Sequence, residues 1–194
     1  MNYPLNISFK LLALASQLSV TDAAGNLVFY VKQKAFKLKE NVGVFADREQ
    51  TRQLYTIKAD RVLDFSGRYQ FTDEHGLGHG SIKRQGMKSL WKSHYEIYDG
   101  ELVAMTIREE NAWVKVLDAL FGEIPVLGMF TGYIFHPAYI VARSTGQPLL
   151  RVAKQPAFFE GKFVVEKQGE MNEAEERRAL LGVVMMILLE RARG

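Results

Sequence analysis

The feature that most constrains the fold is a stretch near the C-terminus that has no polar side chain. It reads Ala-Leu-Leu-Gly-Val-Val-Met-Met-Ile-Leu-Leu from Ala179 to Leu189. Asn172 and Glu175 precede it in the pattern of a capping box, and Arg191 follows it, so the charges suit the two ends of a helix dipole. The sequence therefore predicts a helix over about 172–192 that is apolar on every side.

A helix of this kind must be surrounded, either by lipid or by protein. Eleven residues at a rise of about 1.5 Å span roughly 16 Å, whereas the hydrocarbon layer of a bilayer is about 30 Å thick. We therefore expect strands of the same chain to surround the helix. The alternative is a helix that packs on the outside of a β-sandwich.

A short repeat organises the rest of the chain. An apolar residue, any residue and an acid recur before a turn, and a degenerate copy carries arginine in place of the acid. The third positions are 25, 26, 26 and 44 residues apart. An aspartate at a strand end can accept a hydrogen bond from the backbone two residues on, and glycine soon follows in every copy except the second. Each copy therefore predicts a β-hairpin; the copies are Val20-Thr21-Asp22, Phe45-Ala46-Asp47, Phe71-Thr72-Asp73, Ile97-Tyr98-Asp99 and Val141-Ala142-Arg143.

Five hairpins predict ten strands, because apolar residues alternate with period two on both sides of the turns. β-rich runs at Leu5–Phe9, Val62–Phe65 and Phe158–Val165 bring the total to about twelve. A barrel this wide is not filled by its own side chains. We predict one mainly β domain over residues 1–194, a closed antiparallel barrel of about twelve strands around the C-terminal helix. The longer gap of 44 residues predicts an inserted amphipathic helix at about 111–121.

Three features resemble the LURP-one-related family: hairpins such as Tyr95-Glu96-Ile97-Tyr98-Asp99-Gly100-Glu101-Leu102-Val103, the phrase Gly78-His79-Gly80-Ser81-Ile82-Lys83-Arg84, and the apolar terminal helix. The family is grouped structurally with the tubby C-terminal domain and the phospholipid scramblases. The resemblance implies a twelve-stranded barrel around a central helix. Tubby domains bind phosphoinositide head groups through basic side chains, and scramblases are associated with moving membrane lipid. The acylated cysteines associated with scramblases are excluded, because the chain has no cysteine.

Two basic runs are candidate sites for anionic lipid, because clustered cations attract negative head groups. The alternative is that lysines simply solvate exposed strands and edges. The net charge of +3 is far from that of a dedicated nucleic-acid binder, so no nucleic-acid partner is expected. The candidate residues are Lys32, Lys34, Lys37 and Lys39 in the first run and Lys83, Arg84, Lys88 and Lys92 in the second.

An apolar segment after the inserted helix is a second candidate surface. Large apolar patches rarely face water without a partner, so its side chains predict contact with a membrane or a homodimer formed through residues 112–130. The alternative places the later part of this segment in a core strand. The contact candidates are Phe121, Ile124, Leu127 and Phe130.

No catalytic motif is visible in the sequence. His75 and His79 have a spacing that binds metal on a helix, but they lie in a glycine-rich turn, so no metal or cofactor is expected. The apolar run after Lys10 is too short for a secretory signal, which favours a cytoplasmic protein, peripheral at the membrane. We predict a non-enzymatic module that binds anionic lipid or a protein partner. The alternatives are a small-molecule-binding protein or enzyme with a groove at the barrel mouth, and a structural homo-oligomer.

Overall fold

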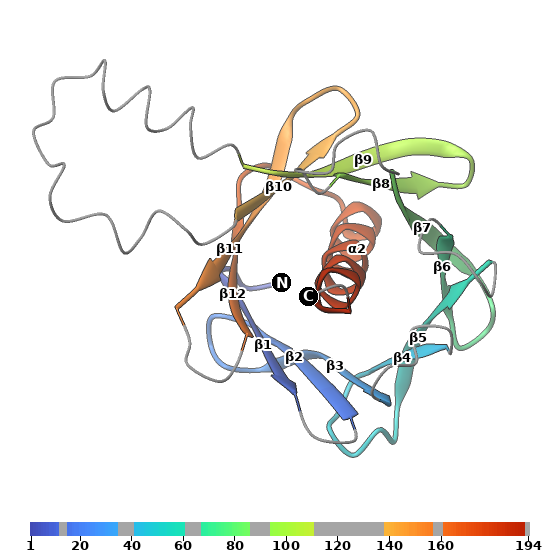
Figure 1. Ribbon diagram of the computed structural model, residues 1–194, viewed down its shortest axis with the longest axis vertical. Coiled ribbons are helices and arrows are strands. Elements are labelled where there is room, and N and C mark those ends of the chain that lie inside the picture. Colours follow the sequence, from blue (N-terminus) through green and yellow to red (C-terminus); the bar gives the residue numbers. More distant parts are fainter. Residues whose placement is uncertain are drawn as a thin grey trace, which may run out of the picture.

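Twelve antiparallel strands close into a barrel around one helix (Figure 1). The computed structural model describes residues 1–11, 15–34, 41–60, 67–85, 94–110, 138–156 and 161–192, without the side chains at 11, 15, 16, 33 and 34. Each strand pairs with its neighbours in the chain, and β1 pairs with β12 to close the barrel. The strands are β1 Leu5–Leu11, β2 Ala15–Thr21, β3 Leu27–Lys34, β4 Val42–Phe45, β5 Gln53–Ala59, β6 Arg68–Asp73, β7 Gly78–Arg84, β8 His94–Asp99, β9 Leu102–Glu109, β10 Ala138–Arg143, β11 Pro148–Gln155 and β12 Gly161–Lys167.

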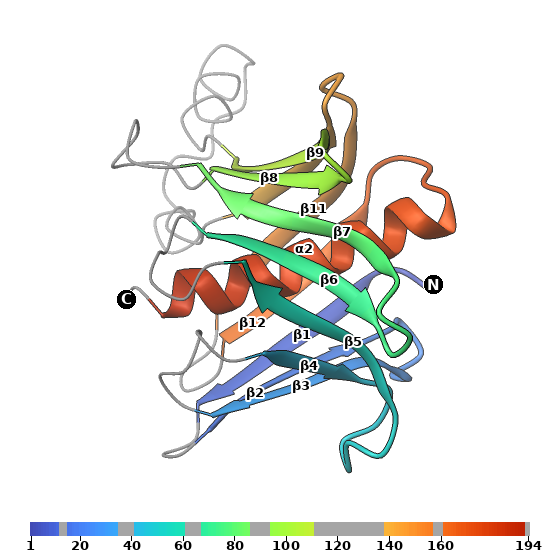
Figure 2. The ribbon, with the colours of Figure 1, turned by 90° about the vertical axis from the view of Figure 1, so that its right-hand side faces the viewer.

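The helix α2, Glu173–Arg191, runs through the barrel from one end to the other (Figure 2). Every residue from Arg178 to Leu189 is buried, which explains why the helix lacks a polar face. Asn172 accepts a hydrogen bond from the backbone of Glu175, whose carboxylate accepts one from the backbone of Asn172. The predicted helix, its capping box and its position inside the barrel are confirmed.

The hairpin turns use the predicted chemistry. Asp22 accepts hydrogen bonds from the backbone N–H groups of Ala24 and Asn26, and Gly25 adopts a positive φ of 84°. At the second copy of the repeat, which lacks a glycine, Gln50 takes a positive φ of 62°. The turn therefore keeps its geometry where the sequence departs from the repeat.

Ten strands come from the five hairpins, and β1 and β12 complete the barrel. Two of the three extra β-rich runs are thus confirmed as strands. The third, Val62–Phe65, and the expected helix at about 111–121 lie outside the described residues.

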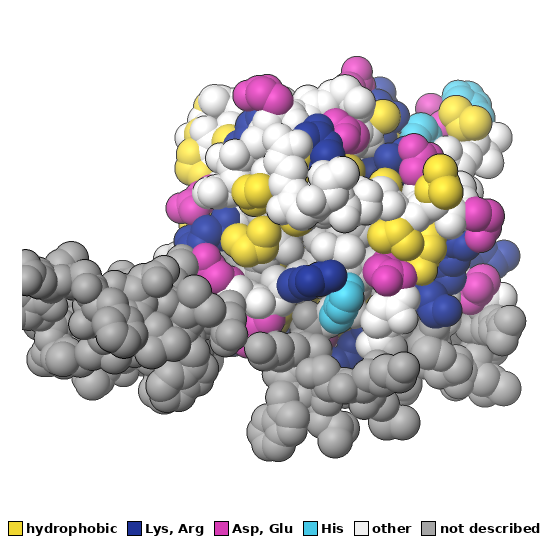
Figure 3. Space-filling view, turned by 90° about the horizontal axis from the view of Figure 1, so that it is seen from above, with side chains coloured by type: hydrophobic (Ala, Val, Ile, Leu, Met, Phe, Trp, Pro, Cys, Tyr) yellow, Lys and Arg dark blue, Asp and Glu magenta, His cyan; other side chains and the backbone are white. Residues whose placement is uncertain are grey.

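We name the two ends of the barrel after the terminus of α2 that lies there, the N-end and the C-end. The five hairpin turns lie at the N-end, and the odd-numbered strands run from the N-end to the C-end. The wall above α2 in Figure 1, formed by β8, β9 and β10, carries hydrophobic side chains among charged ones (Figure 3). Within the described part of the chain, no helix has the length and hydropathy needed to cross a bilayer.

Candidate functional site

At the N-end, the third positions of two copies of the repeat contact the first turns of α2. Asp99 lies 2.8 Å from Nη2 of Arg178. At the degenerate copy, the Nε of Arg143 donates to Glu175 over 2.9 Å. This copy carries arginine in place of the acid because α2 presents the carboxylate of Glu175 to it. At Asp99 the helix presents the guanidinium of Arg178 instead. These pairs fix α2 in the barrel.

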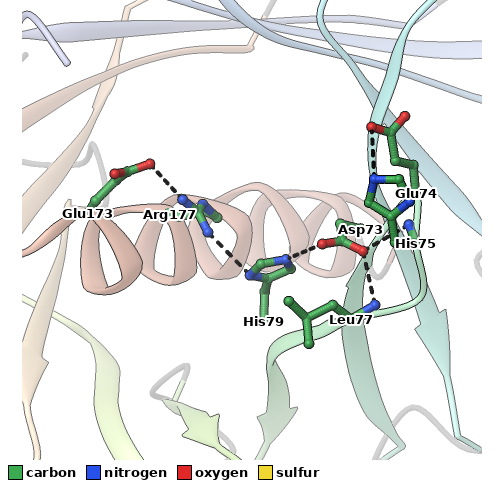
Figure 4. Close-up of polar contacts among 7 residues, drawn as sticks. All are labelled: Asp73, Glu74, His75, Leu77, His79, Glu173 and Arg177. Atoms are coloured by element: carbon green, nitrogen blue, oxygen red, sulfur yellow. Dashed lines mark hydrogen bonds and ion pairs between the residues drawn. The ribbon is translucent and has the colours of Figure 1, made fainter.

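His79 belongs to the same set of contacts (Figure 4). Its Nε2 lies 2.9 Å from the carboxylate of Asp73, and its Nδ1 lies 3.3 Å from Nη1 of Arg177, which also donates to Glu173. A guanidinium can only donate, so Nδ1 accepts and Nε2–H donates to Asp73. The hydrogen bond from His79 holds the pKa of Asp73 below its ordinary value.

With both ring nitrogens engaged, His79 is not placed to act as a general base, so the contact is structural. The described residues contain no group of three or more potential ligands that could hold a metal ion. The pair His75 and His79 does not converge on a shared site: the Nε2 of His75 faces Glu74 at 3.7 Å, whereas that of His79 faces Asp73.

At the C-end, a second polar group lies inside the barrel. The hydroxyl of buried Tyr95 donates to Glu190, and burial raises the pKa of Tyr95 well above its ordinary range. The Nε of Arg84 lies 4.0 Å from the same carboxylate. Arg84 therefore faces the interior beside an acid, which makes it a poorer anion-binding candidate than an outward lysine.

The two predicted basic runs do not meet. Lys32 is exposed on β3 and Lys83 lies on β7, with β4, β5 and β6 between them in the barrel. Lys83 also has Glu96 as its register partner on β8. Lys34 ends β3, and its side chain is not described. The other predicted contact residues lie outside the described residues: Lys37, Lys39, Lys88, Lys92, Phe121, Ile124, Leu127 and Phe130.

Another group of cations lies where the strands carry few acids, since β12 contains only Glu166. Five consecutive strands, β1 to β5, contain no aspartate or glutamate. We define the lysine face as the exposed Lys10, Lys32 and Lys162, near the C-end of β1, β3 and β12, with Ser8 and Gln17 between them. All five side chains point outward, because they alternate with buried residues along their strands.

Uncharged residues separate the lysines in the register of the sheet. Gln17 of β2 pairs with Lys10 on one side and Lys32 on the other. Lys162 pairs with Ser8 and Gln155. Within the described part of the chain, neither Lys32 nor Lys162 has an ion-pair partner. The charges of Lys32 and Lys162 therefore have uncharged neighbours in the sheet, whereas Lys83 lies in register with Glu96.

Lys10, Gln17 and Lys162 are not among the site residues that the sequence predicts. The absence of acids from the strands between Leu5 and Lys34 is visible in the sequence. The closure of β12 against β1, which brings Lys162 to the same face, is a property of the barrel alone.

Comparison with known proteins gives one match. A family model described as LURP-one-related matches residues 27–124, which begin at β3 and extend past β9. No curated protein and no solved structure matches the chain.

Proposed function

This chain belongs to the LURP-one-related family, and we propose that it is a non-enzymatic binding module that contacts anionic membrane lipid through the lysine face. The observation that carries the proposal is the placement of the exposed Lys32 and Lys162 on one outer face, where their register partners Gln17, Ser8 and Gln155 are uncharged. Cations near a membrane surface each contribute about 1 kcal/mol of attraction to anionic lipid.

Several other charged groups are less suited to a partner, because they are paired within the protein. At the N-end, Glu173, Glu175 and Asp99 each contact an arginine. On β11, next to the strand that carries Lys162, Arg151 contacts both Glu110 and Glu166. Such pairs fix the fold and leave little net charge for a partner.

Vesicle co-sedimentation tests the proposal. The protein is mixed with phosphatidylcholine vesicles with and without phosphatidylserine, and only the anionic vesicles are expected to bind it. The double variant Lys32→Gln/Lys162→Gln should bind roughly thirtyfold more weakly, since two lysines at about 1 kcal/mol each are removed.

The matched control is Arg48→Gln/Arg52→Gln, which removes the same charge from two exposed residues of the β4–β5 turn at the N-end. This variant should bind like the unchanged protein. Equal losses in both double variants would show that net charge alone matters and would refute the proposed face. Absence of binding to anionic vesicles would refute the function.

A further inference from the structure

We propose that an extended acidic segment of another protein binds this barrel as an added β-strand, at a split between β3 and β4. This inference goes beyond the contact with lipid and does not depend on it. It starts from the ladder between β3 and β4, which is the shortest in the described part of the barrel.

The ladder between β3 and β4 ends early. It contains two register pairs, Tyr30 opposite Phe45 and Val31 opposite Val44. Among the described residues, every other pair of neighbouring strands shares at least four register pairs. Because β3 runs from the N-end to the C-end, the split begins after Val31 and faces the C-end.

Beyond this point each strand is paired along one edge. Residues 32–34 of β3 pair with β2, whereas Val42 and Gly43 of β4 pair with β5. Within the described part of the chain, neither group has a register partner across the split. The N–H and C=O groups of alternate residues in a strand point to opposite edges, so both strands present backbone donors and acceptors to the split. Unpaired groups of this kind are a template for a strand of another chain.

The two faces of the sheet define which side chains an added strand should carry. On the inner face, Val31 and Val42 are each 1% exposed and belong to the core. On the outer face, the exposed Lys32 and Lys58 lie on β3 and β5, on either side of the split. Neither lysine has an acidic register partner, since β1 to β5 contain no acid and Lys58 pairs with Gln70 on β6.

Successive side chains of a strand point to opposite faces of the sheet. The segment that fits the split therefore alternates apolar residues, which face the core, with acidic residues, which face Lys32 and Lys58. In such strand addition the main-chain hydrogen bonds supply the affinity and the alternate side chains supply the specificity. Charge complementarity thus assigns the split to an acidic partner.

Fluorescence anisotropy with synthetic peptides tests the choice of partner. The probe is a capped peptide of alternating glutamate and valine, and the comparison peptide has lysine in place of glutamate. The glutamate peptide is expected to bind at least about tenfold more tightly, because like charges across an interface are unfavourable. Lys32→Gln/Lys58→Gln should weaken its binding about fivefold. Arg108→Gln is the control, since Arg108 is exposed on β9 in the opposite wall of the barrel, and should bind like the unchanged protein. Equal affinity for both peptides would overturn the acidic partner.

Peptides with N-methyl groups test the backbone pairing without any change to the protein. One peptide is methylated at its valines and another at its glutamates, so each loses the N–H donors of one edge and keeps its charges. One of the two should bind at least about tenfold more weakly than the unmethylated peptide, because an added strand pairs along the edge that faces β3. Weaker binding of both would place the peptide between β3 and β4 and would equally support the split. Unchanged binding of both would overturn strand addition.

Hydrogen exchange followed by NMR locates the bound peptide. Amides within residues 32–34, or those of Val42 and Gly43, should exchange at least about tenfold more slowly when the glutamate peptide is bound. Slower exchange that is confined to other strands would overturn the location of the site.

These outcomes are separate from those of lipid binding. The peptides carry no lipid, so absence of peptide binding would overturn the split and leave the lysine face standing, whatever the vesicles show. Sedimentation tests the other possible occupant of the split: a dimer of the protein that the glutamate peptide dissociates would place a second copy of this chain there. That result would overturn the assignment to a segment of another protein.

Discussion

Arg178 of the central helix and Asp99 at the end of β8 form an ion pair of 2.8 Å, and the Nε of Arg178 donates to the backbone oxygen of His79 over 3.1 Å. The side chain of Arg178 is only 10% exposed, whereas that of Asp99 is 61% exposed. A cation this deeply buried depends on its partners, because an unpaired buried charge is costly. The pair thus joins the helix to two neighbouring hairpins, β6–β7 and β8–β9.

We expect Asp99→Asn to lower the free energy of unfolding by about 1–2 kcal/mol, since a hydrogen bond to a charged group contributes about 1.5–3 kcal/mol and the exposure of Asp99 reduces this. Urea denaturation measures the change. Glu101→Gln in the same turn is the control: Glu101 is 90% exposed, and its partner Arg68 has further contacts with Ser81 and Gly100. A larger loss in the control would contradict this account.

Gly80 is required by the close packing of Arg178. Its φ is +111°, and a Cβ atom there would lie 2.4 Å from the backbone oxygen of Tyr98 and 2.8 Å from Nε of Arg178. Gly80→Ala should therefore lower the free energy of unfolding by at least about 2 kcal/mol. Gly78→Ala, two residues earlier, has no atom within 4 Å of the added Cβ and should change stability little. Thermal denaturation of both variants tests this contrast.

Gly182 lets the helix approach β8. A Cβ atom at this position would lie 2.5 Å from Cδ1 of Ile97. Overpacking costs about 1–3 kcal/mol, and alanine returns about 1 kcal/mol of helix propensity, so Gly182→Ala should destabilise the protein by up to about 2 kcal/mol. Ile97→Val removes the clashing methyl group. In that background Gly182→Ala should be neutral or stabilising, and a full cost in both backgrounds would contradict the contact.

Variants of Arg143 test why this copy of the repeat carries arginine in place of an acid. Its guanidinium donates to Glu175 and to the backbone oxygen of Glu170. Restoring the acid of the other copies with Arg143→Asp should destabilise the protein more than Arg143→Gln, because the aspartate would repel Glu175 while the glutamine would not. Chemical denaturation of the two variants measures the order, and the reverse order would contradict the explanation of the exchange.

The lowered pKa of Asp73 predicts that the free energy of unfolding depends on pH in the acidic range. Its pKa is lowered in the folded protein, first by the hydrogen bond from His79 and then by the backbone N–H groups of Leu77 and His75. A lowered carboxyl pKa contributes stability above the unfolded pKa of about 3.9, and this contribution is lost as the pH falls through the folded pKa. Asp73→Asn should therefore be less stable than the unchanged protein at pH about 5, and the difference should shrink toward pH about 2.5. Urea midpoints across this range test the prediction, and a difference that does not change with pH would refute it.

Much of the fold was predictable because it rests on short-range patterns. The capping box of Asn172 and Glu175 joins residues three positions apart, and Asp22 closes its turn onto Ala24 and Asn26. Period-two alternation and the length of the apolar run then led to a barrel around a helix. These features depend on the local chain, so the sequence shows them directly.

The candidate site was only partly predictable. The basic run that contains Lys32 predicted this residue as a site residue. The run groups its lysines because they are close in the sequence, and its later members lie outside the described residues. The second run gave Arg84, which faces Glu190 inside the barrel, and Lys83, which pairs in register with Glu96. Neighbours along a strand point to opposite sides of the sheet, so a run of cations is not a cationic face.

The sequence by itself determined the hairpins and the apolar helix, because turn chemistry and alternation act over a few residues. It also shows directly that β1 to β5 contain no acid. Only the tertiary structure decided which distant residues meet. Barrel closure brings Lys162 beside Ser8, register places Gln17 between Lys10 and Lys32, and the helix brings Arg178 to Asp99. These contacts depend on the closed sheet as a whole, since a shift of one residue in register would turn each side chain to the other face.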